Sequence, residues 1–356
     1  MTRPAHTFKP IAHGFTLVEL MVAMTIGLII LGAVAQIFAT SRGTYALEEG
    51  LARLQENGRF AMNFVTEDIR MAGYTGCARL STGQIGNMVD PPADPTTFNP
   101  DGIRGHASTG AGTNLGDWNP ALPATYFSNG EVEAGTDVII IQHASSLGTH
   151  LTGNLVPSNA NIQILNTAQI TSQIAAGDVL MVADCKAADI FKATSVSGGG
   201  KVTIAHSNSG NTSPFLDHAY GNEAELMKLV SRVYFIGTGV STGTSASTAP
   251  ALFRKDLVAG VLQAQELVDG VEDMRVFYGE DTAVTADSAV NIFRPANTVT
   301  DWSKVVSVRI GLLLRTPHES GGDFDTNTYD VAGATVDPTD DRRQRRVFTT
   351  IIQLRN

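Results

Sequence analysis

The chain has 356 residues and a net charge of −10, from 25 Lys and Arg against 35 Asp and Glu. A chain this long can bury a sizeable core, and its acidic balance repels nucleic acid, for which it carries no recognisable binding motif. Two cysteines, Cys77 and Cys185, are too few for a zinc cluster but can form one disulfide in an oxidising compartment. No spacing typical of a cofactor site, a metal centre or a catalytic constellation stands out.

The first predicted element is a membrane anchor. Residues 20–41 contain no charged side chain, and as a helix they would be roughly 33 Å long, enough to cross a hydrocarbon core of ~30 Å. Arg3 and Lys9 precede this run, and no acidic residue precedes Glu19. The positive-inside rule therefore keeps the N-terminus in the cytoplasm and the rest of the chain outside. A secretory signal has a shorter apolar region of ~7–15 residues, which makes it the weaker interpretation.

Glu19 is unusual at the edge of such a segment. A carboxylate there costs a few kcal/mol, so it usually has a partner or a function. The run GFTLVELMVAM, residues 14–24, resembles the type IV prepilin signature. The resemblance implies that prepilin peptidase cuts after Gly14 and that the new N-terminal Phe15 is methylated. It also implies that Glu19 pairs with the N-terminal amine of a neighbouring subunit and guides its assembly.

The helix is predicted to continue past the membrane. Apolar residues recur at spacings of three, four or seven, the pattern of an amphipathic helix: Leu47, Leu51, Leu54, Ala61, Val65, Ile69 and Ala72. Charged residues, Asp68 among them, are assigned to its polar faces. Gly73 and Gly76 then supply helix-stop chemistry. We expect one long helix from Phe15 to Ala72, embedded in the membrane at its start and packed on its own domain at its end.

The remainder is predicted to be β-rich. Residues 81–130 are rich in Gly, Pro, Asn and Ser and predict long loops. The run QELVDGVED, residues 265–273, is interpreted as a short helix or turn. Strands are expected at 137–143, 179–183, 201–206, 228–236, 251–256, 274–278, 305–315 and 346–354. The fold class is therefore α+β and pilin-like, with a long N-terminal helix on an antiparallel β-sheet domain with long loops. Three parts are expected: a leader peptide over 1–14, the transmembrane and amphipathic helix over 15–76, and a periplasmic β-rich domain over 77–356.

The C-terminal third resembles a narrower family. LVDGVEDMRVFYGED (267–281), WSKVVSVRIGLLLRT (302–316) and DRRQRRVFTTIIQLRN (341–356) resemble, in this order, the closing segments of PilW-type minor pilins, and AGYTGC (72–77) also fits. The resemblance implies a non-enzymatic subunit in the bacterial inner membrane that meets other minor and major pilins and the pilus assembly machinery. Its expected role is to prime the pilus or to sit at its tip, supporting motility, adhesion or DNA uptake. No proline interrupts residues 15–89, whereas major pilins commonly break this helix with one, so the unbroken helix suits a scarce subunit.

Three other functions remain open. A minor pseudopilin of type II secretion shares the signature and the helix, and gene neighbourhood would separate the two. A membrane-tethered periplasmic enzyme and a surface adhesin are further alternatives. An outward-facing domain also favours a Cys77–Cys185 disulfide, which would close a loop of about a hundred residues and contribute up to ~4–5 kcal/mol.

Two polar motifs are candidate binding sites. Oxygen-bearing side chains alternate as in a calcium loop at Asp323, Asp325, Asn327 and Asp330. Thr328 replaces the central glycine, and Ala334 stands where a bidentate Glu is needed, so a solvated acidic turn is the better interpretation. DRRQRR, residues 341–346, is interpreted as a solvated loop before an edge strand, with docking to another subunit as the alternative.

Overall fold

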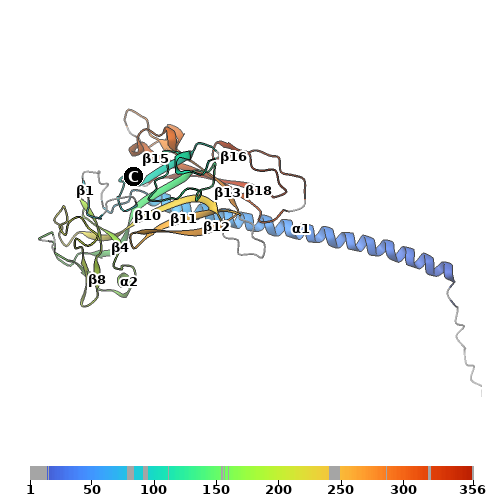
Figure 1. Cartoon of the computed structure of the whole chain (residues 1–356), viewed down its shortest axis with the longest axis horizontal. Helices are drawn as coiled ribbons and strands as arrows, with labels where there is room; N and C mark the ends of the chain where they lie inside the picture. Colours follow the sequence, from blue (N-terminus) through green and yellow to red (C-terminus); the bar gives the residue numbers. More distant parts are fainter. Residues whose placement is uncertain are drawn as a thin grey trace, which may run out of the picture.

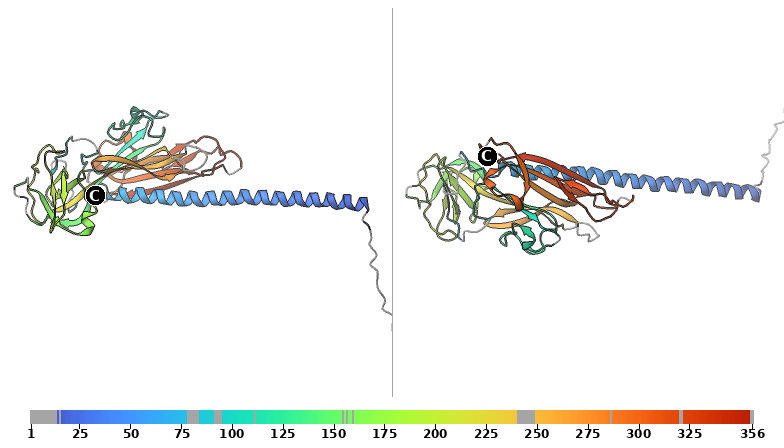
Figure 2. Two further views of the ribbon diagram at one scale, coloured as in Figure 1. Left: turned by 60° about the horizontal axis from the view of Figure 1, so that its bottom comes forward. Right: turned by 90° about the horizontal axis from the view of Figure 1, so that it is seen from above.

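The computed structural model describes residues 14, 16–77, 84–90, 95–110, 112–153, 155, 157–158, 160–239, 249–285, 287–319 and 322–354. Phe15 and nearly all of the expected leader lie outside the described residues. The molecule is elongated: a single long helix projects from a β-rich domain whose strands run beside the second half of the helix (Figure 1). A further lobe lies at the far end of the domain, beyond the end of the helix (Figure 2).

The long helix α1 runs without interruption from Leu17 to Met71, as the sequence predicts. Its second half buries one stripe, which consists of Leu54, Gly58, Ala61, Val65, Asp68 and Ile69. The helix ends where predicted, because Gly73 adopts a φ of 75°, a left-handed conformation that favours glycine. The α+β, pilin-like fold class is therefore confirmed.

The larger sheet contains nine strands within the described residues, in the order β1-β7-β6-β10-β4-β2-β3, with β11 beside β10 and β12 beside β11. Its pairings are antiparallel except between β1 and β7. Strands β4 and β10 form its long centre. The bounds are β1 Ile85–Asn87, β2 Ile103–Ser108, β3 Trp118–Asn119, β4 Val138–His150, β6 Val179–Ala183, β7 Ala188–Lys192, β10 Glu225–Thr238, β11 Pro250–Val258 and β12 Val261–Asp269.

A second, fully antiparallel sheet has the order β14-β13-β15-β18. Its strands are β13 Val271–Glu280, β14 Ile292–Pro295, β15 Val305–Arg315 and β18 Arg345–Gln353. Smaller units complete the domain: the hairpin β16 Tyr329–Val331 and β17 Ala334–Val336, the sheet of β5 Ile162–Leu165, β8 Ser195–Ser197 and β9 Lys201–Ala205, the helix α2 Ala168–Thr171, and the 3₁₀ turns η2 Leu115–Asp117, η3 Ala296–Thr298 and η4 Trp302–Lys304.

The main core lies where α1 meets both sheets. The buried stripe of α1 packs with residues of β4 and β10 on the larger sheet and of β13, β15 and β18 on the second sheet. Gly58 is required at this contact, because any Cβ there would collide with the ring of Phe348 on β18. A separate core fills the distal lobe around β5, β6, β7 and β9. A disulfide joins Cys77, just after α1, to Cys185, which lies 108 residues further along the chain between β6 and β7.

Most strand predictions agree with the structure, and β6 and β15 have the predicted bounds. The prediction of a short helix or turn over residues 265–273 is correct only at Gly270, because the residues before it end β12 and those after it begin β13. Gly270, with a φ of 74°, makes the sharp turn between the two strands. The loop prediction for 81–130 is also incomplete, because β2 forms there without an alternating pattern of its own. Strand β2 instead pairs with β4, whose Ile139 and Ile141 are buried in the core.

Asp68 overturns its predicted place on a polar face. It is only 4% exposed and forms an ion pair with Arg232 of β10, while the hydroxyl of Tyr234, also on β10, donates a hydrogen bond to its other oxygen. Arg232 Nε is 2.8 Å from Oδ1 of Asp256 on β11. A charge buried in the helix stripe is stable only when it is paired and hydrogen-bonded. Asp68 therefore fixes the position of α1 on the larger sheet.

Asp68→Ala is expected to lower the free energy of unfolding by about 2–4 kcal/mol, because Arg232 and Tyr234 lose the carboxylate that they share and Tyr234 keeps only the carbonyl oxygen of Phe64, at 3.2 Å. The range stays below that of a fully buried pair, because Arg232 is partly exposed and retains Asp256. Denaturant unfolding of the full chain in detergent measures the effect. Glu67→Ala is the matched control, since Glu67 is the exposed neighbour on the same helix. Equal stability of the two variants would contradict this role of Asp68.

Candidate functional site

The start of α1 is held by a reciprocal cap between Thr16 and Glu19. The backbone N–H and the hydroxyl of Thr16 each donate to Oε2 of Glu19 at 2.9 Å. The N–H of Glu19 points back to the Thr16 hydroxyl oxygen at 3.3 Å. This capping box satisfies amide groups that the first turn of a helix leaves without partners. The carboxylate of Glu19 therefore lies beside the backbone nitrogen that directly follows Phe15.

The sequence interpretation assigned no role to Thr16. The signal was present, because Thr-x-x-Glu ahead of an apolar run is the pattern of a capping box. Gly14 is described just before this cap. Gly14, the predicted cleavage position, and Glu19, a predicted assembly residue, thus both lie at the start of the helix.

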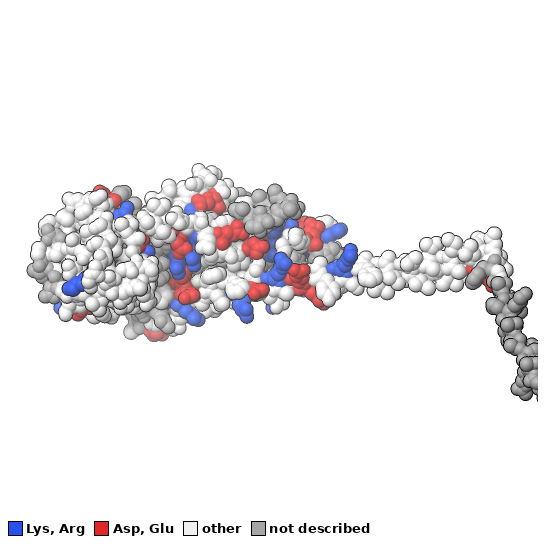
Figure 3. Space-filling view, turned by 90° about the horizontal axis from the view of Figure 1, so that it is seen from below, with Lys and Arg blue, Asp and Glu red and all other residues white. Residues whose placement is uncertain are grey.

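The first half of α1 presents apolar side chains to its surroundings on every side. Fourteen large ones between Leu17 and Phe38 are exposed, with Leu17 at 75% and Ile29 at 72%. Thr25 does not disturb this surface, because its hydroxyl donates to the carbonyl oxygen of Met21 or Val22, at 3.0 and 2.9 Å. In Figure 3 the projecting helix is almost free of charge, whereas Lys, Arg, Asp and Glu gather on the domain beside it. This helix is long and apolar enough to cross a membrane.

A small cavity marks the place where α1 leaves the domain. Its volume is about 250 Å³, and it lies between the helix and the segment that follows β15. The lining residues are Ala46, Leu47, Glu49, Gly50, Arg53, Thr316, Pro317, His318 and Glu319. The part of α1 before this cavity projects from the domain, and the part after it packs on the two sheets.

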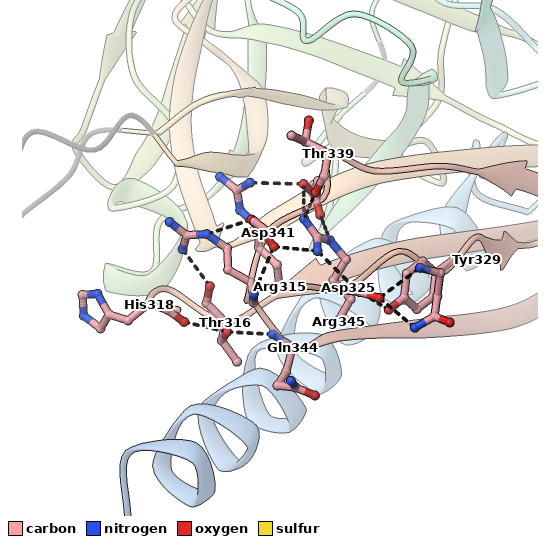
Figure 4. A network of polar contacts seen from close by, with 12 residues as sticks. Arg315, Thr316, His318, Asp325, Tyr329, Thr339, Asp341, Gln344 and Arg345 are labelled. Carbon is pink, nitrogen blue, oxygen red and sulfur yellow. Dashed lines mark hydrogen bonds and ion pairs between the residues drawn. The ribbon is translucent and has the colours of Figure 1, made fainter. Parts of the chain in front are cut away.

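The arginine-rich segment that leads into β18 is only in part a solvated loop, because Arg342 and Gln344 are exposed but the side chain of Arg345, the first residue of β18, is not. Arg345 is completely buried and is surrounded by carboxylates from three parts of the chain (Figure 4). Its Nε is 2.7 Å from Glu272, and its Nη1 is 2.8 Å from Asp341 and 3.2 Å from Asp325. Arg343 also turns inward and donates to the carbonyl oxygens of residues 316 and 317. The prediction failed because ion pairs between distant segments leave no periodic signal in the sequence.

Two residues of the calcium-like pattern, Asp325 and Asn327, belong to the same network, while Asp330 accepts a hydrogen bond from the N–H of Gly333 in the turn between β16 and β17. Asp325 accepts hydrogen bonds from the Tyr329 hydroxyl at 2.6 Å and from the Asn327 amide at 2.8 Å, and it pairs with Arg345. Burial opposes ionisation, but these hydrogen bonds outweigh it and hold the pKa of Asp325 below its ordinary value of 3.8. Within the described part of the chain, no three His, Cys, Asp or Glu side chains are grouped to hold a metal ion. The pattern therefore forms a structural turn around Arg345.

Two family models match the chain. The model described as type IV pilus-assembly protein W, or PilW, matches residues 233–356, and that of the prokaryotic N-terminal methylation motif matches residues 10–35. The chain is a type IV pilin of the PilW family. No curated protein and no solved structure shows a significant match.

The two matches coincide with two parts of the pilin described above. One covers the start of α1 with its Thr16–Glu19 cap, and the other covers the last strands of the larger sheet and the whole second sheet. The predicted family is confirmed. The protein is a minor pilin that takes part in type IV pilus assembly together with other pilus components, and its family is of a structural, non-catalytic kind. The apolar helix and the prepilin motif indicate anchoring in a membrane through the N-terminus.

Arg345→Met is expected to lower the free energy of unfolding by about 2–4 kcal/mol near neutral pH, because Glu272, Asp325 and Asp341 lose the cation that they share. Arg315 and Arg343 still pair with Glu272 and Asp341, so the loss stays below that of a buried charge left without any partner. The loss should shrink on acidification. Burial opposes ionisation of Asp341, but hydrogen bonds from Arg343 and Arg345 outweigh it, so the pKa values of Asp325 and Asp341 are both lowered in the fold. Their stabilising effect is therefore present above the ordinary carboxyl pKa and disappears as the pH falls through the lowered one.

Thermal unfolding of the full chain between pH 3 and pH 7, with and without this substitution, measures that difference. Arg346→Met is the matched control, because Arg346 is exposed on the same strand and, among the described residues, its side chain contacts the ring of Phe348 but no carboxylate. A deficit that is the same at every pH would show that the carboxylates are not what Arg345 stabilises.

Proposed function

We propose that this pilin is made as a precursor whose leader, residues 1–14, is removed by prepilin peptidase after Gly14, and that Phe15 is then methylated. The first half of α1 holds the mature chain in the bacterial inner membrane, and residues 77–356 form a periplasmic domain that enters the extracellular pilus when the subunit assembles. The methylation-motif match over residues 10–35 supports this processing. The Cys77–Cys185 disulfide supports an oxidising compartment for the domain.

The observation that carries the assembly mechanism is the position of Glu19. Its carboxylate lies at the outer end of an exposed apolar helix and accepts a hydrogen bond at 2.9 Å from the amide next to Phe15. Among packed apolar helices a carboxylate is costly unless it meets a positive charge. Cleavage creates such a charge on each subunit, the amine of Phe15. Glu19 therefore pairs with the Phe15 amine of a neighbouring subunit, and the Thr16 cap holds the carboxylate in place beforehand.

The shape of the domain supports a priming or tip role alongside other minor and major pilins. The distal lobe lies at and beyond the end of α1 (Figure 2), so it would occupy the space above the subunit along the helix direction. A subunit of this shape suits the terminal position of a filament better than a repeated one. The unbroken α1 agrees with a scarce subunit. From that position the pilin acts as a structural element in pilus-dependent motility, adhesion or DNA uptake, without catalysis.

Deletion of the gene tests this role directly. Cells without the pilin are expected to carry far fewer pili by electron microscopy, and the full-length gene should restore them. Normal pilus number with lost surface attachment would point to an adhesin instead. Normal pilus number with lost protein secretion would point to a pseudopilin. Either of these results contradicts the priming role.

Gly14→Val is expected to block removal of the leader, because the substitution adds a branched side chain at the cleavage position. Intact-mass spectrometry of the membrane-extracted protein should then show a chain that retains residues 1–14. The unaltered protein should begin at Phe15 and carry the added mass of one methyl group. Gly43→Val is the control, since Gly43 lies on α1 with open space around it. Normal processing of the Gly14 variant would contradict the proposed cleavage site.

A further inference from the structure

Arg309 lies on the face of the second sheet that points away from α1. On β15 it stands directly across from Phe277 of β13 and Ile351 of β18. The residues on either side of it, Val308 and Ile310, are fully buried in the core beneath α1. Because side chains alternate along a strand, the row formed by Phe277, Arg309 and Ile351 must occupy the opposite, outer face.

The guanidinium of Arg309 lies against two aromatic rings. Its central carbon is 4.5 Å from the ring centroid of Phe293 on β14 and 5.1 Å from that of Phe277. Its Nε is buried and has no hydrogen-bond partner. In the described part of the chain Arg309 forms no ion pair, whereas Arg275, two residues before Phe277 on β13, is paired with Asp273 at 2.7 Å. Arg309 is thus an oriented cation for which the described residues supply no anionic partner.

The surroundings of Arg309 are partly covered and partly open. On one side the hairpin of β16 and β17 packs over Gly311, where a Cβ would lie 2.8 Å from the backbone nitrogen of Ala332, and its turn reaches the guanidinium, because a Cβ at Gly333 would lie 3.0 Å from Nη2 of Arg309. On the other side the surface is open, because Ile351 is 60% exposed on β18, the edge strand of the sheet. We call the open surface, made of Phe277, Phe293, Arg309, Thr349 and Ile351, the Arg309 face.

We infer that the Arg309 face is a docking surface for another pilus subunit that presents a carboxylate side chain flanked by apolar ones. A planar guanidinium lying against aromatic rings is suited to a charge-assisted pair with a carboxylate, which no group in the described part of the chain supplies to Arg309. An exposed isoleucine beside an arginine and aromatic rings is the composition found at the energetic centres of protein interfaces. Small molecules prefer concave sites, and this is the face of a sheet. The inference rests on the proposed function, because it requires neighbouring pilus subunits.

The test uses the full-length pilin in cells that make pili. The photo-reactive residue p-benzoylphenylalanine replaces Ile351, and the cross-linked product is identified by mass spectrometry. A cross-link to another pilus subunit, close to an Asp or Glu of that subunit, is expected. Arg309→Glu should reduce its yield by about tenfold or more, because the pair becomes repulsive. Arg309→Lys should retain part of it, since a lysine keeps the charge but not the planar fork.

Matched controls separate docking from folding. Arg104→Glu changes an exposed arginine on β2 of the other sheet and should leave the cross-link unchanged. The same photo-reactive residue at Leu165, which is 63% exposed in the distal lobe, should not give the Arg309-dependent product. Equal amounts of each variant in the membrane, with the Cys77–Cys185 disulfide formed, show that folding is intact.

The decisive arm reverses the charges. Replacing the cross-linked Asp or Glu of the partner with Arg should restore the product in the Arg309→Glu variant. A cross-link that does not depend on Arg309, or no cross-link to a pilus subunit, overturns the inference. These failures are distinct from a failure of the proposed function, which is judged by pilus number after gene deletion. Cells that need the pilin for pili yet form them normally with Arg309→Glu would retain the function and lose the docking surface.

Discussion

The apolar surface of the first half of α1 finds no packing partner in the described part of its own chain, and this constraint governs the organisation of the pilin. Each large apolar side chain that leaves water contributes about 1.5–3 kcal/mol, and fourteen of them are exposed between Leu17 and Phe38. Such a surface is stable in a membrane or among other apolar helices. The same segment can therefore anchor the subunit before assembly and join it to its neighbours afterwards. Glu19 lies at the N-terminal end of this segment.

The rest of the domain holds the second half of α1 in a fixed place. Two sheets pack on one apolar stripe of the helix. The Asp68–Arg232 ion pair fixes the position of the helix on the larger sheet, which apolar contacts alone specify less strictly. Arg345 draws the segment before β18 against Glu272 of β13, which stabilises the sheet that covers α1. The distal lobe has its own core and is connected through β10, β4 and the disulfide. A rigid domain on a free apolar helix suits a subunit that must leave the membrane as a unit.

Local patterns were enough to predict the frame of this structure but not its polar contacts. The run of residues 20–41 and the apolar spacing from Leu47 to Ala72 predicted α1 nearly to its ends, because helix periodicity is a property of neighbouring residues. Asp68 was misplaced because its partners are 164 and 166 residues away in sequence. The sequence also suggested a solvated segment around Arg345, since nothing local indicates that Glu272, 73 residues earlier in the chain, forms an ion pair with it. The Thr16 cap, in contrast, is a local feature, since Thr16 to Glu19 carry the whole capping-box pattern.

The central claim is that Glu19 serves assembly and not anchoring. It is tested most directly by the amount of full-length Glu19→Ala pilin in sheared pili relative to the membrane, with Glu48→Ala on the exposed face of α1 as the control. The account predicts that the Glu19 variant is processed and reaches the membrane at the normal level but is lost from the pilus fraction. The control should enter pili normally. Normal recovery of the Glu19 variant in pili would contradict the account.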